Sequence, residues 1–219
     1  MDTRIEVCPA CGTDGAIDLT FSLTSAGRPM ARACRRPSCQ HVFSERPGRP
    51  SPGSDAWVDA SVTRITARRD LPRIACVGEP ILAARLGAAG YAVIECDPDA
   101  GSFDDAIEAD VWVIARALER SREPGAVLQR MSKRLGATGS LLVDVRQWDP
   151  PSRVGPQLCE PRRLDDPARV NFFSRYSLVS LLWRSGLMVT GLEPAPPGGR
   201  LAVWARPAAF GPRSDSWAS

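Results

Sequence analysis

Short apolar runs alternate with helix-like segments between residues 73 and 205, and this alternation restricts the possible folds more than any other feature. The apolar runs are typical of buried strands, and the segments between them begin at a proline or end just before a glycine, as helices do. Such alternation predicts an α/β fold with a doubly wound, mostly parallel sheet. The expected elements are strands 73–77, 91–96, 110–115 and 140–145, helices 80–89, 124–135 and 174–185, and a closing hairpin of strands 187–192 and 201–205 that adds one antiparallel strand.

The chain divides into two modules at a segment rich in proline and glycine. Residues 44–54 read SERPGRPSPGS, and such a stretch without large apolar side chains is typical of a linker. We therefore expect a small module over residues 1–43, a linker over 44–55 and a larger module over 56–207. Residues 208–219 lack a periodic pattern and are expected to form a disordered tail.

Charge and apolar pattern exclude some classes of partner. The net charge is +3, from 28 basic and 25 acidic residues, which is too balanced to indicate nucleic acid or a membrane surface. No apolar run is long enough to span a bilayer and no signal-peptide core is present, so we expect a cytoplasmic protein with no membrane partner. Thiols stay reduced there, so the seven cysteines are expected to be metal ligands or buried apolar residues.

Two cysteine pairs in the small module form a pattern typical of a zinc site. CPACG and CRRPSCQH place Cys8, Cys11, Cys34 and Cys39 at a spacing that lets four thiolates surround one tetrahedral ion. A segment of about 40 residues buries too little apolar surface to fold alone, so Zn²⁺ would supply the missing stability. We predict a small zinc ribbon, in which His41, the only histidine, is the alternative to Cys39 as fourth ligand.

The spacing within the ribbon resembles one known group of zinc proteins. The four-residue spacer in CRRPSC is similar to that of the Ogr/Delta phage late-transcription activators. The resemblance covers about 35 residues and does not by itself predict DNA binding. The ribbon has a basic edge formed by Arg28, Arg32, Arg35 and Arg36. A solvated loop explains this edge more simply than a phosphate contact does, so nucleic acid is the least favoured partner.

The larger module resembles the class I S-adenosylmethionine-dependent methyltransferases. Four stretches carry the resemblance in the family's order: IACVG, LAARLGAAGYAVIECD, DVWVIARALERSREPGAVLQRMSKRLGATGSLLVDV and NFFSRYSLVSLLWRSGLMVTGLEP. Together they run from about residue 73 to the end of the module, and their ordered agreement is more specific than any single match. The resemblance implies a Rossmann-like methyltransferase fold, S-adenosylmethionine as cofactor and a small molecule as methyl acceptor.

The resemblance also implies a cofactor site at Gly78, Glu79, Asp97 and Arg116, in a loop that departs from the family pattern. The family's glycine-rich loop lets the backbone approach the cofactor, whereas here Glu79 and Pro80 follow Gly78 and the loop is about two residues short. Asp97 either accepts the ribose hydroxyls or is simply a turn residue before a proline. The segment after Asp97 is too short for the helix and strand that the family places there, so the sheet is expected to be trimmed by about one strand.

Substrate contacts are expected near the ends of two later stretches. Glu119 lies in LER, where the family often has LEH, and Asn171 lies in ARVNFFS, where relatives often have GHvnyfs. Trp148 belongs to the long segment 146–173, which would cover the substrate. These three residues are the substrate candidates.

A general base would have to be something other than histidine. His41 lies in the ribbon, so the larger module has no histidine of its own. Asp144, Asp149 and Tyr176 remain as weak candidates, and a base matters mainly for hydroxyl or acidic-carbon acceptors.

Two functions fit these observations. The first is a methyltransferase that uses S-adenosylmethionine on an unidentified small molecule. The second is a catalytically inactive, methyltransferase-like interaction or scaffold protein that docks to a protein partner through its zinc ribbon. The altered glycine loop and the missing strand favour the second, and the intact middle and late stretches favour the first only weakly because core packing alone would retain them. A nucleic-acid-binding regulator is the third reading.

Overall fold

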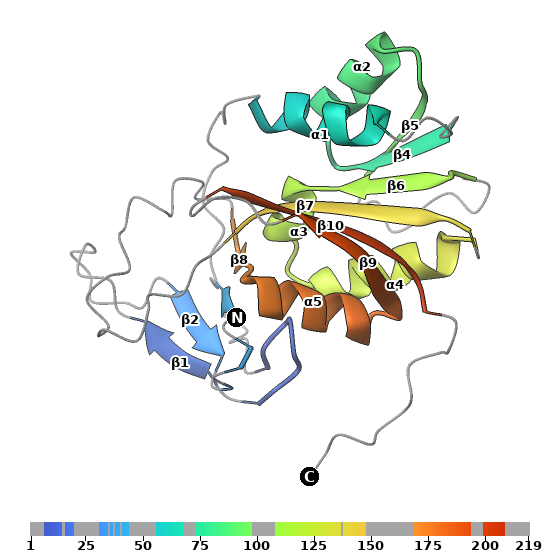
Figure 1. Cartoon of the computed structure of the whole chain (residues 1–219). Coiled ribbons are helices and arrows are strands. Elements are labelled where there is room, and N and C mark those ends of the chain that lie inside the picture. Colours follow the sequence, from blue (N-terminus) through green and yellow to red (C-terminus); the bar gives the residue numbers. More distant parts are fainter. Residues whose placement is uncertain are drawn as a thin grey trace.

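The computed structural model describes two sheets and the helices that cover the larger one (Figure 1). The described residues are 7–14, 16–19, 31–34, 36, 38–39, 41–43, 56–67, 73–97, 108–136, 138–147, 169–193 and 199–208. The predicted linker and tail, and the candidates Trp148 and Asp149, lie outside these residues. The elements are β1 (Ala16–Leu19), β2 (Ala31–Cys34), β3 (Val42–Phe43), α1 (Ala56–Thr66), β4 (Arg73–Val77), α2 (Pro80–Ala88), β5 (Ala92–Cys96), β6 (Val111–Ile114), α3 (Arg116–Arg120), α4 (Pro124–Arg134), β7 (Ser140–Arg146), β8 (Asn171–Phe172), α5 (Arg175–Arg184), β9 (Leu187–Glu193) and β10 (Arg200–Pro207).

The larger sheet confirms the predicted α/β class. Its strand order is β5-β4-β6-β7-β10-β9, in which β5, β4, β6 and β7 run parallel. β10 lies antiparallel to both β7 and β9, as expected for a closing hairpin inserted into a parallel sheet. Within the described part of the chain β5 is the edge strand, in agreement with a sheet trimmed by about one strand.

Local sequence signals set the ends of the helices. Proline occupies the first turn of both α2 and α4, where its missing N–H costs no hydrogen bond. The Ser174 hydroxyl caps α5 by accepting a hydrogen bond from the N–H of Ser177. Gly186, which follows α5, has a φ of +78°, a left-handed conformation that glycine adopts without steric cost. The predicted strands and helices therefore agree with the observed ones to within two residues at each end.

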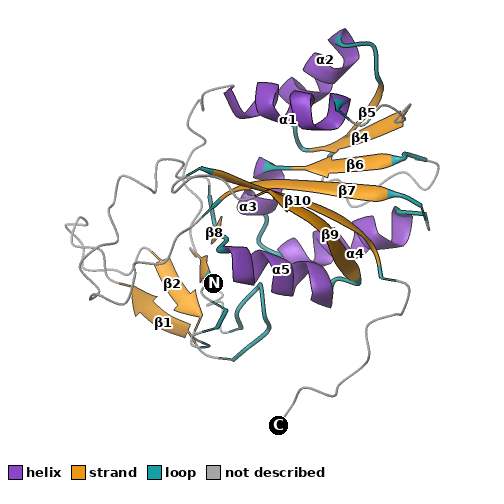
Figure 2. Cartoon of the chain, in the orientation of Figure 1, coloured by secondary structure: helices purple, strands orange, loops and turns teal. Residues whose placement is uncertain are grey.

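Helices cover both faces of the larger sheet, as the doubly wound prediction requires (Figure 2). Alternate residues of β4 point to opposite faces: Ile74 and Cys76 pack with Leu82 and Leu86 of α2, whereas Ala75 and Val77 belong to the core beneath the other helices. α4 and α5 supply the other face, and the large side chains there are fully buried. No helix in the described residues is both long and apolar enough to cross a bilayer.

Three elements of the larger module were not predicted from the sequence. α1 follows the linker directly and buries Trp57, Val58, Ser61 and Ile65, a pattern interrupted by a polar residue. α3 has only five residues. β8 has two residues, too few for any periodicity to indicate a strand.

The short strand β8 joins the two predicted modules. The smaller sheet has the order β1-β2-β3-β8, so three of its strands come from the cysteine ribbon and one from the larger module. In the antiparallel β3–β8 pair Val42 lies opposite Phe172, and Phe43 lies opposite Asn171. Buried residues of the ribbon, including Cys8 and Cys39, also share one apolar core with α4 and α5.

Candidate functional site

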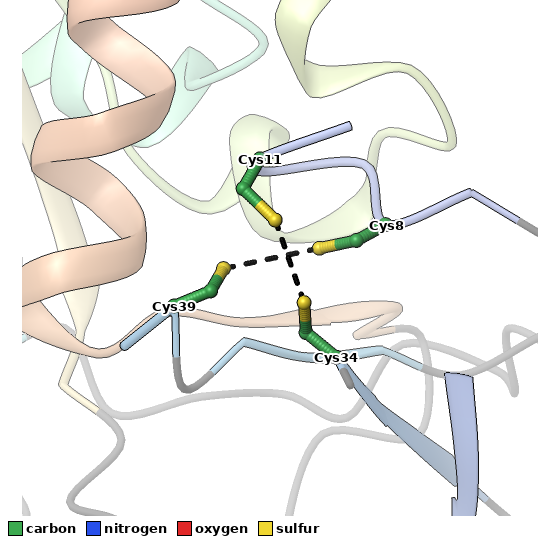
Figure 3. A group of neighbouring side chains, drawn as sticks. All are labelled: Cys8, Cys11, Cys34 and Cys39. Atoms are coloured by element: carbon green, nitrogen blue, oxygen red, sulfur yellow. Dashed lines mark hydrogen bonds between the residues drawn. The ribbon is translucent and has the colours of Figure 1, made fainter. Parts of the chain in front are cut away.

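The four predicted metal ligands converge on one point (Figure 3). The Sγ atoms of Cys8, Cys11, Cys34 and Cys39 all lie within 4.8 Å of one another. The Cys8–Cys39 pair is 3.9 Å apart and the Cys11–Cys34 pair is 3.4 Å apart. A tetrahedron with Zn–S bonds of about 2.3 Å has edges of about 3.8 Å, so the donor set and its size both fit Zn²⁺.

The backbone around the cysteines forms a tight knuckle. Gly12 follows Cys11 with a φ of +67°, and its N–H donates to the carbonyl of Cys8 at 2.8 Å. The N–H of Cys8 in turn donates to the carbonyl of Thr13 at 3.0 Å. In the second pair the N–H of Arg36 points to the Cys34 sulfur at 3.4 Å. Such N–H groups stabilise a thiolate, so the loops are shaped for metal-bound cysteines.

The electrostatics of the cluster also favour a cation. The Cys39 thiol, hydrogen-bonded to Cys8, lowers the pKa of Cys8 to about 4, and the same contact raises the pKa of Cys39. Burial raises the pKa of Cys34 to about 12. The thiols alone therefore cannot all ionise, because each thiolate opposes the next. A divalent ion removes that repulsion and lets all four bind as thiolates.

His41 lies outside the cluster and links the ribbon to the larger module. Its ring is fully buried between Phe43 and Phe173, at centroid distances of 5.9 and 5.0 Å. The Nε2 atom of His41 lies 3.2 Å from Oδ1 of Asn171. The Asn171 amide nitrogen already donates to the carbonyl oxygens of α3, so Oδ1 is an acceptor and His41 donates to it from Nε2. The structure thus places Cys39 in the cluster of four ligands and His41 outside it.

Asn171, a substrate candidate, is held in this buried connection. Its Nδ2 donates to the carbonyls of Ser121 at 2.6 Å and Leu118 at 3.3 Å. These carbonyls lie at the end of α3, where the helix leaves them without partners. With a side chain that is 1% exposed, Asn171 joins the ribbon to the end of α3.

Two of the cofactor candidates meet at the carboxyl end of the parallel strands. Gly78 ends β4 with a φ of +65°, and its N–H donates to the carbonyl of Cys96 at 2.7 Å. Asp97 follows Cys96 directly, so the glycine and the acidic residue lie side by side at one edge. This is the edge at which open α/β sheets bind ligands.

Glu79 fills the space beside this pair. Its side chain is only 5% exposed, and its Oε1 accepts a hydrogen bond from the N–H of Ala117 at 3.1 Å. Ala117 lies in α3, directly after β6, so the carboxylate spans the gap between the ends of neighbouring strands β4 and β6. Pro80, by contrast, is exposed to solvent. The Glu79 side chain therefore lies between the ends of these two strands, and Arg116 acts on it as a positive charge nearby.

Burial of Glu79 makes the stability of the protein depend on pH. Burial raises the pKa of Glu79 from 4.5 to about 7, and the N–H of Ala117 and the charges of Arg116 and Arg200 offset only part of this. The folded protein holds this proton after the unfolded chain has lost it, so the free energy of unfolding should fall between about pH 4.5 and pH 7.

Glu79→Gln tests this pH dependence. The amide keeps the acceptor for Ala117 and cannot ionise, so the variant should match the wild type near pH 4.5 and exceed its stability above pH 7. The expected gain is at most about 3 kcal/mol. Urea unfolding of both proteins at pH 5 and pH 8 measures it. If the free energies of unfolding of the variant and the wild type differ by the same amount at both pH values, the Glu79 carboxylate is solvated.

Glu119, the second substrate candidate, is part of another buried network. Its Oε1 contacts Nη2 of Arg169 at 2.5 Å and accepts from the N–H of Arg146 at 3.1 Å. Arg169 also donates to the carbonyl of Arg146 at 2.8 Å. The side chains of Glu119 and Arg169 are 6% and 5% exposed, so this pair holds α3, β7 and the start of β8 together. Arg169, from the stretch ARVNFFS, is thus the partner of the glutamate in LER.

The two catalytic candidates that the structure describes, Asp144 and Tyr176, lie in different surroundings. Asp144 is fully buried on β7, where it accepts from Ser61 at 2.7 Å, Arg200 at 2.6 Å and Arg64 at 3.2 Å. Tyr176 lies on α5 and is 63% exposed. Sequence reasoning missed the partners of Asp144 because two of them belong to α1, and a serine and an arginine one turn apart give no motif.

Comparisons with known proteins agree with the fold. No protein-family model matches the chain, and no curated protein matches it. Human N-acetylserotonin methyltransferase in complex with S-adenosylmethionine is similar in structure, with a TM-score of 0.50, 17% identity, and coverage of 71% of this chain and 52% of that one. Mitomycin 7-O-methyltransferase has a TM-score of 0.48 at 18% identity, covering 68% of this chain and 53% of that one. Burkholderia thailandensis 1,6-didemethyltoxoflavin-N1-methyltransferase has 0.49 at 14% identity, covering 77% and 96%.

The similarity to the human enzyme concerns the fold class. The likeness to the human enzyme, together with the mostly parallel sheet, identifies a Rossmann-like class I methyltransferase fold. At 17% identity the likeness concerns the fold alone. The chain spans about half the length of the N-acetylserotonin and mitomycin enzymes, 52% and 53% respectively.

Proposed function

We propose that the chain is a methyltransferase-like protein that does not use S-adenosylmethionine and acts by binding another molecule. One observation carries this proposal: the buried side chain of Glu79 spans the ends of β4 and β6 and takes the N–H of Ala117. In the class I methyltransferases that the sequence resembles, a loop of small residues at this position lets the backbone approach the methionine part of the cofactor. The Glu79 side chain fills that space, and its negative charge, when ionised, would repel the carboxylate of the cofactor.

Displacement of Glu79 by a ligand would be costly. The ligand would have to break the hydrogen bond to Ala117 and bring its own carboxylate to a position that favours neutral groups, since the pKa of Glu79 is already about 7 there. The short loop offers little compensation, because Pro80 has no N–H to donate. Burial of Glu79 therefore supports a closed crevice.

We further propose that Cys8, Cys11, Cys34 and Cys39 hold one Zn²⁺ as a structural ion. All four protein ligands are present in a closed set, which leaves no open coordination position for catalysis. Zn²⁺ would supply folding energy to the ribbon and no chemistry. The ribbon then contributes a rigid surface to the protein.

The side-by-side placement of Gly78 and Asp97 favours a second candidate, an active methyltransferase. In that case Asp97 would bind the ribose of S-adenosylmethionine, and Glu79 would rotate out of the crevice. Positioning of the methyl acceptor would then supply most of the rate.

Calorimetric titration of the zinc-loaded, folded protein with S-adenosylmethionine separates the two. We expect no heat of binding for the wild type, and none for Glu79→Gln, which fills the same space. Glu79→Gly removes the side chain and is expected to bind measurably if the rest of the crevice is intact. Micromolar binding by the wild type that Asp97→Ala abolishes would overturn the proposal and establish the second candidate.

A further inference from the structure

The outer face of α5 presents two large aromatic side chains to solvent. Tyr176 and Trp183 are each 63% exposed, which is unusual for residues of this size. They are seven residues apart on a helix, so they lie on the same side, about 10.5 Å apart along its axis. Arg175 and Arg184 flank them at the two ends of the helix. Arg175 and Arg184 are two and a half turns apart, so they point to opposite sides of the helix, with the two rings between them. We call these four residues the α5 face.

Positive charge is concentrated around these rings. α5 and its neighbour α4 carry Arg175, Arg184, Arg130, Lys133 and Arg134, and neither helix contains an acidic residue. One exposed acidic residue, Glu123, is the N-cap of α4. Although the net charge of the whole chain is only +3, these two helices therefore carry an excess of positive charge.

Arg175 is placed against the preference of its helix. It is the first residue of α5, where the helix dipole is positive and an acidic side chain would be favoured. The residue is exposed, and among the described residues no ion pair is found for it. A cation that stabilises neither a partner nor the helix is a candidate for binding an external anion.

The face continues onto α4 and the ribbon. The Ser132 hydroxyl lies 3.4 Å from the carbonyl of Gly186, so the adjacent and exposed Lys133 lies near the end of α5. On the other side the guanidinium of Arg184 lies against Gly12 of the cysteine knuckle, where no Cβ would fit. Figure 1 shows α4 and α5 next to each other on the same side of the larger sheet.

We propose that the α5 face binds single-stranded nucleic acid. Proteins that bind single strands combine cations that contact the phosphates with aromatic rings on which bases stack. The α5 face has two exposed rings and one arginine on either side of them. An acidic protein segment is the other partner that this charge would attract, and the competition experiment with poly-L-glutamate distinguishes it from a single strand.

This inference is independent of the proposed function. The α5 face shares no residue with the crevice around Gly78, Glu79 and Asp97. The test of nucleic-acid binding therefore does not depend on whether the protein binds S-adenosylmethionine. The two titrations use different ligands and different variants, so their outcomes can be told apart.

Fluorescence anisotropy of a fluorescein-labelled oligothymidylate of 15 nucleotides, titrated with zinc-loaded full-length protein at low salt, tests the proposal. We expect saturable binding that weakens as salt rises. Tyr176→Ala and Trp183→Ala should each weaken binding at least about fivefold, the loss of one stacked base. Trp183→Phe keeps a ring and should retain most of the affinity. Arg175→Ala with Arg184→Ala should reduce the salt slope by about 1.4, two phosphate contacts on a single strand.

The controls decide between a specific face and general attraction of anions. Arg73→Ala removes an exposed arginine from the edge of the larger sheet and should leave the affinity unchanged. Duplex DNA of the same length and poly-L-glutamate should compete at least tenfold more weakly than the unlabelled single strand. Absence of binding at low salt, equal competition by poly-L-glutamate, or no effect of the aromatic substitutions would each overturn the proposal.

Discussion

Loss of the metal from the four-cysteine cluster is expected to lower the melting temperature by on the order of 10 °C. Structural zinc contributes folding free energy directly, because the unfolded chain has no preformed site. Without the ion the four sulfurs within 4.8 Å of one another must shed charge or move apart. The small sheet then loses the knuckle that orders its loops.

The effect should extend beyond the ribbon, because the ribbon is bonded to the larger module at three places. β3 pairs with β8, the hydroxyl of Ser174 donates to the carbonyl of Cys39 at 3.3 Å, and His41 bonds to Asn171. Ser174 is also the cap of α5. Metal loss should therefore weaken the start of α5 and the end of α3 as well as the ribbon.

Metal analysis, thermal unfolding and amide hydrogen exchange measure this prediction. Wild type should contain one Zn²⁺ per chain, and Cys11→Ser should lower both metal content and melting temperature. Cys96→Ala is the matched control, since this buried thiol lies on β5 outside the cluster and its loss should not change the metal content. Exchange that increases in the ribbon and leaves α5 unaltered would contradict the coupling.

The sequence was sufficient for those parts of the fold that depend on local signals. Prolines and glycines mark the ends of α2, α4 and α5, and the cysteine spacing alone places four sulfurs around one point. It was not sufficient for β8, because two residues form a strand only when β3 is already in place to pair with them. Non-local pairing of this kind leaves no periodicity to read.

The adjacency of Gly78 and Asp97 follows from the strand pattern, whereas the contacts of the neighbouring side chains do not. Gly78 and Asp97 do lie together, because strands β4 and β5 are neighbours and end at the same edge. The direction of the Glu79 side chain could not be predicted, since it depends on an N–H from α3. Likewise Glu119 and Arg169, which are 50 residues apart in the chain, meet only in the folded state.

Asp144→Ala is expected to destabilise the protein by about 2–4 kcal/mol. The fully buried carboxylate accepts hydrogen bonds from Ser61, Arg64 and Arg200. The side chain of Arg64 is 23% exposed and that of Arg200 is 20% exposed. Removal of the anion leaves these donors partly desolvated and without their partner. The resulting loss of stability is larger than the net stabilisation that the ion pair provides in the wild type. Ser61 and Arg64 belong to α1, so the substitution also detaches this helix from the larger sheet.

Urea unfolding of Asp144→Ala against Glu193→Ala isolates the buried contribution. Glu193 also pairs with Arg64, at 2.8 Å, but is 51% exposed, so its loss should cost less than about 1 kcal/mol. The two substitutions thus remove partners of the same arginine in different environments. Equal effects would mean that solvent screens Asp144 as well. A general base has to exchange protons with a ligand. The Asp144 carboxylate is enclosed by a serine and two arginines and is not exposed for such an exchange. A large loss of stability in Asp144→Ala would therefore assign a structural role to this residue.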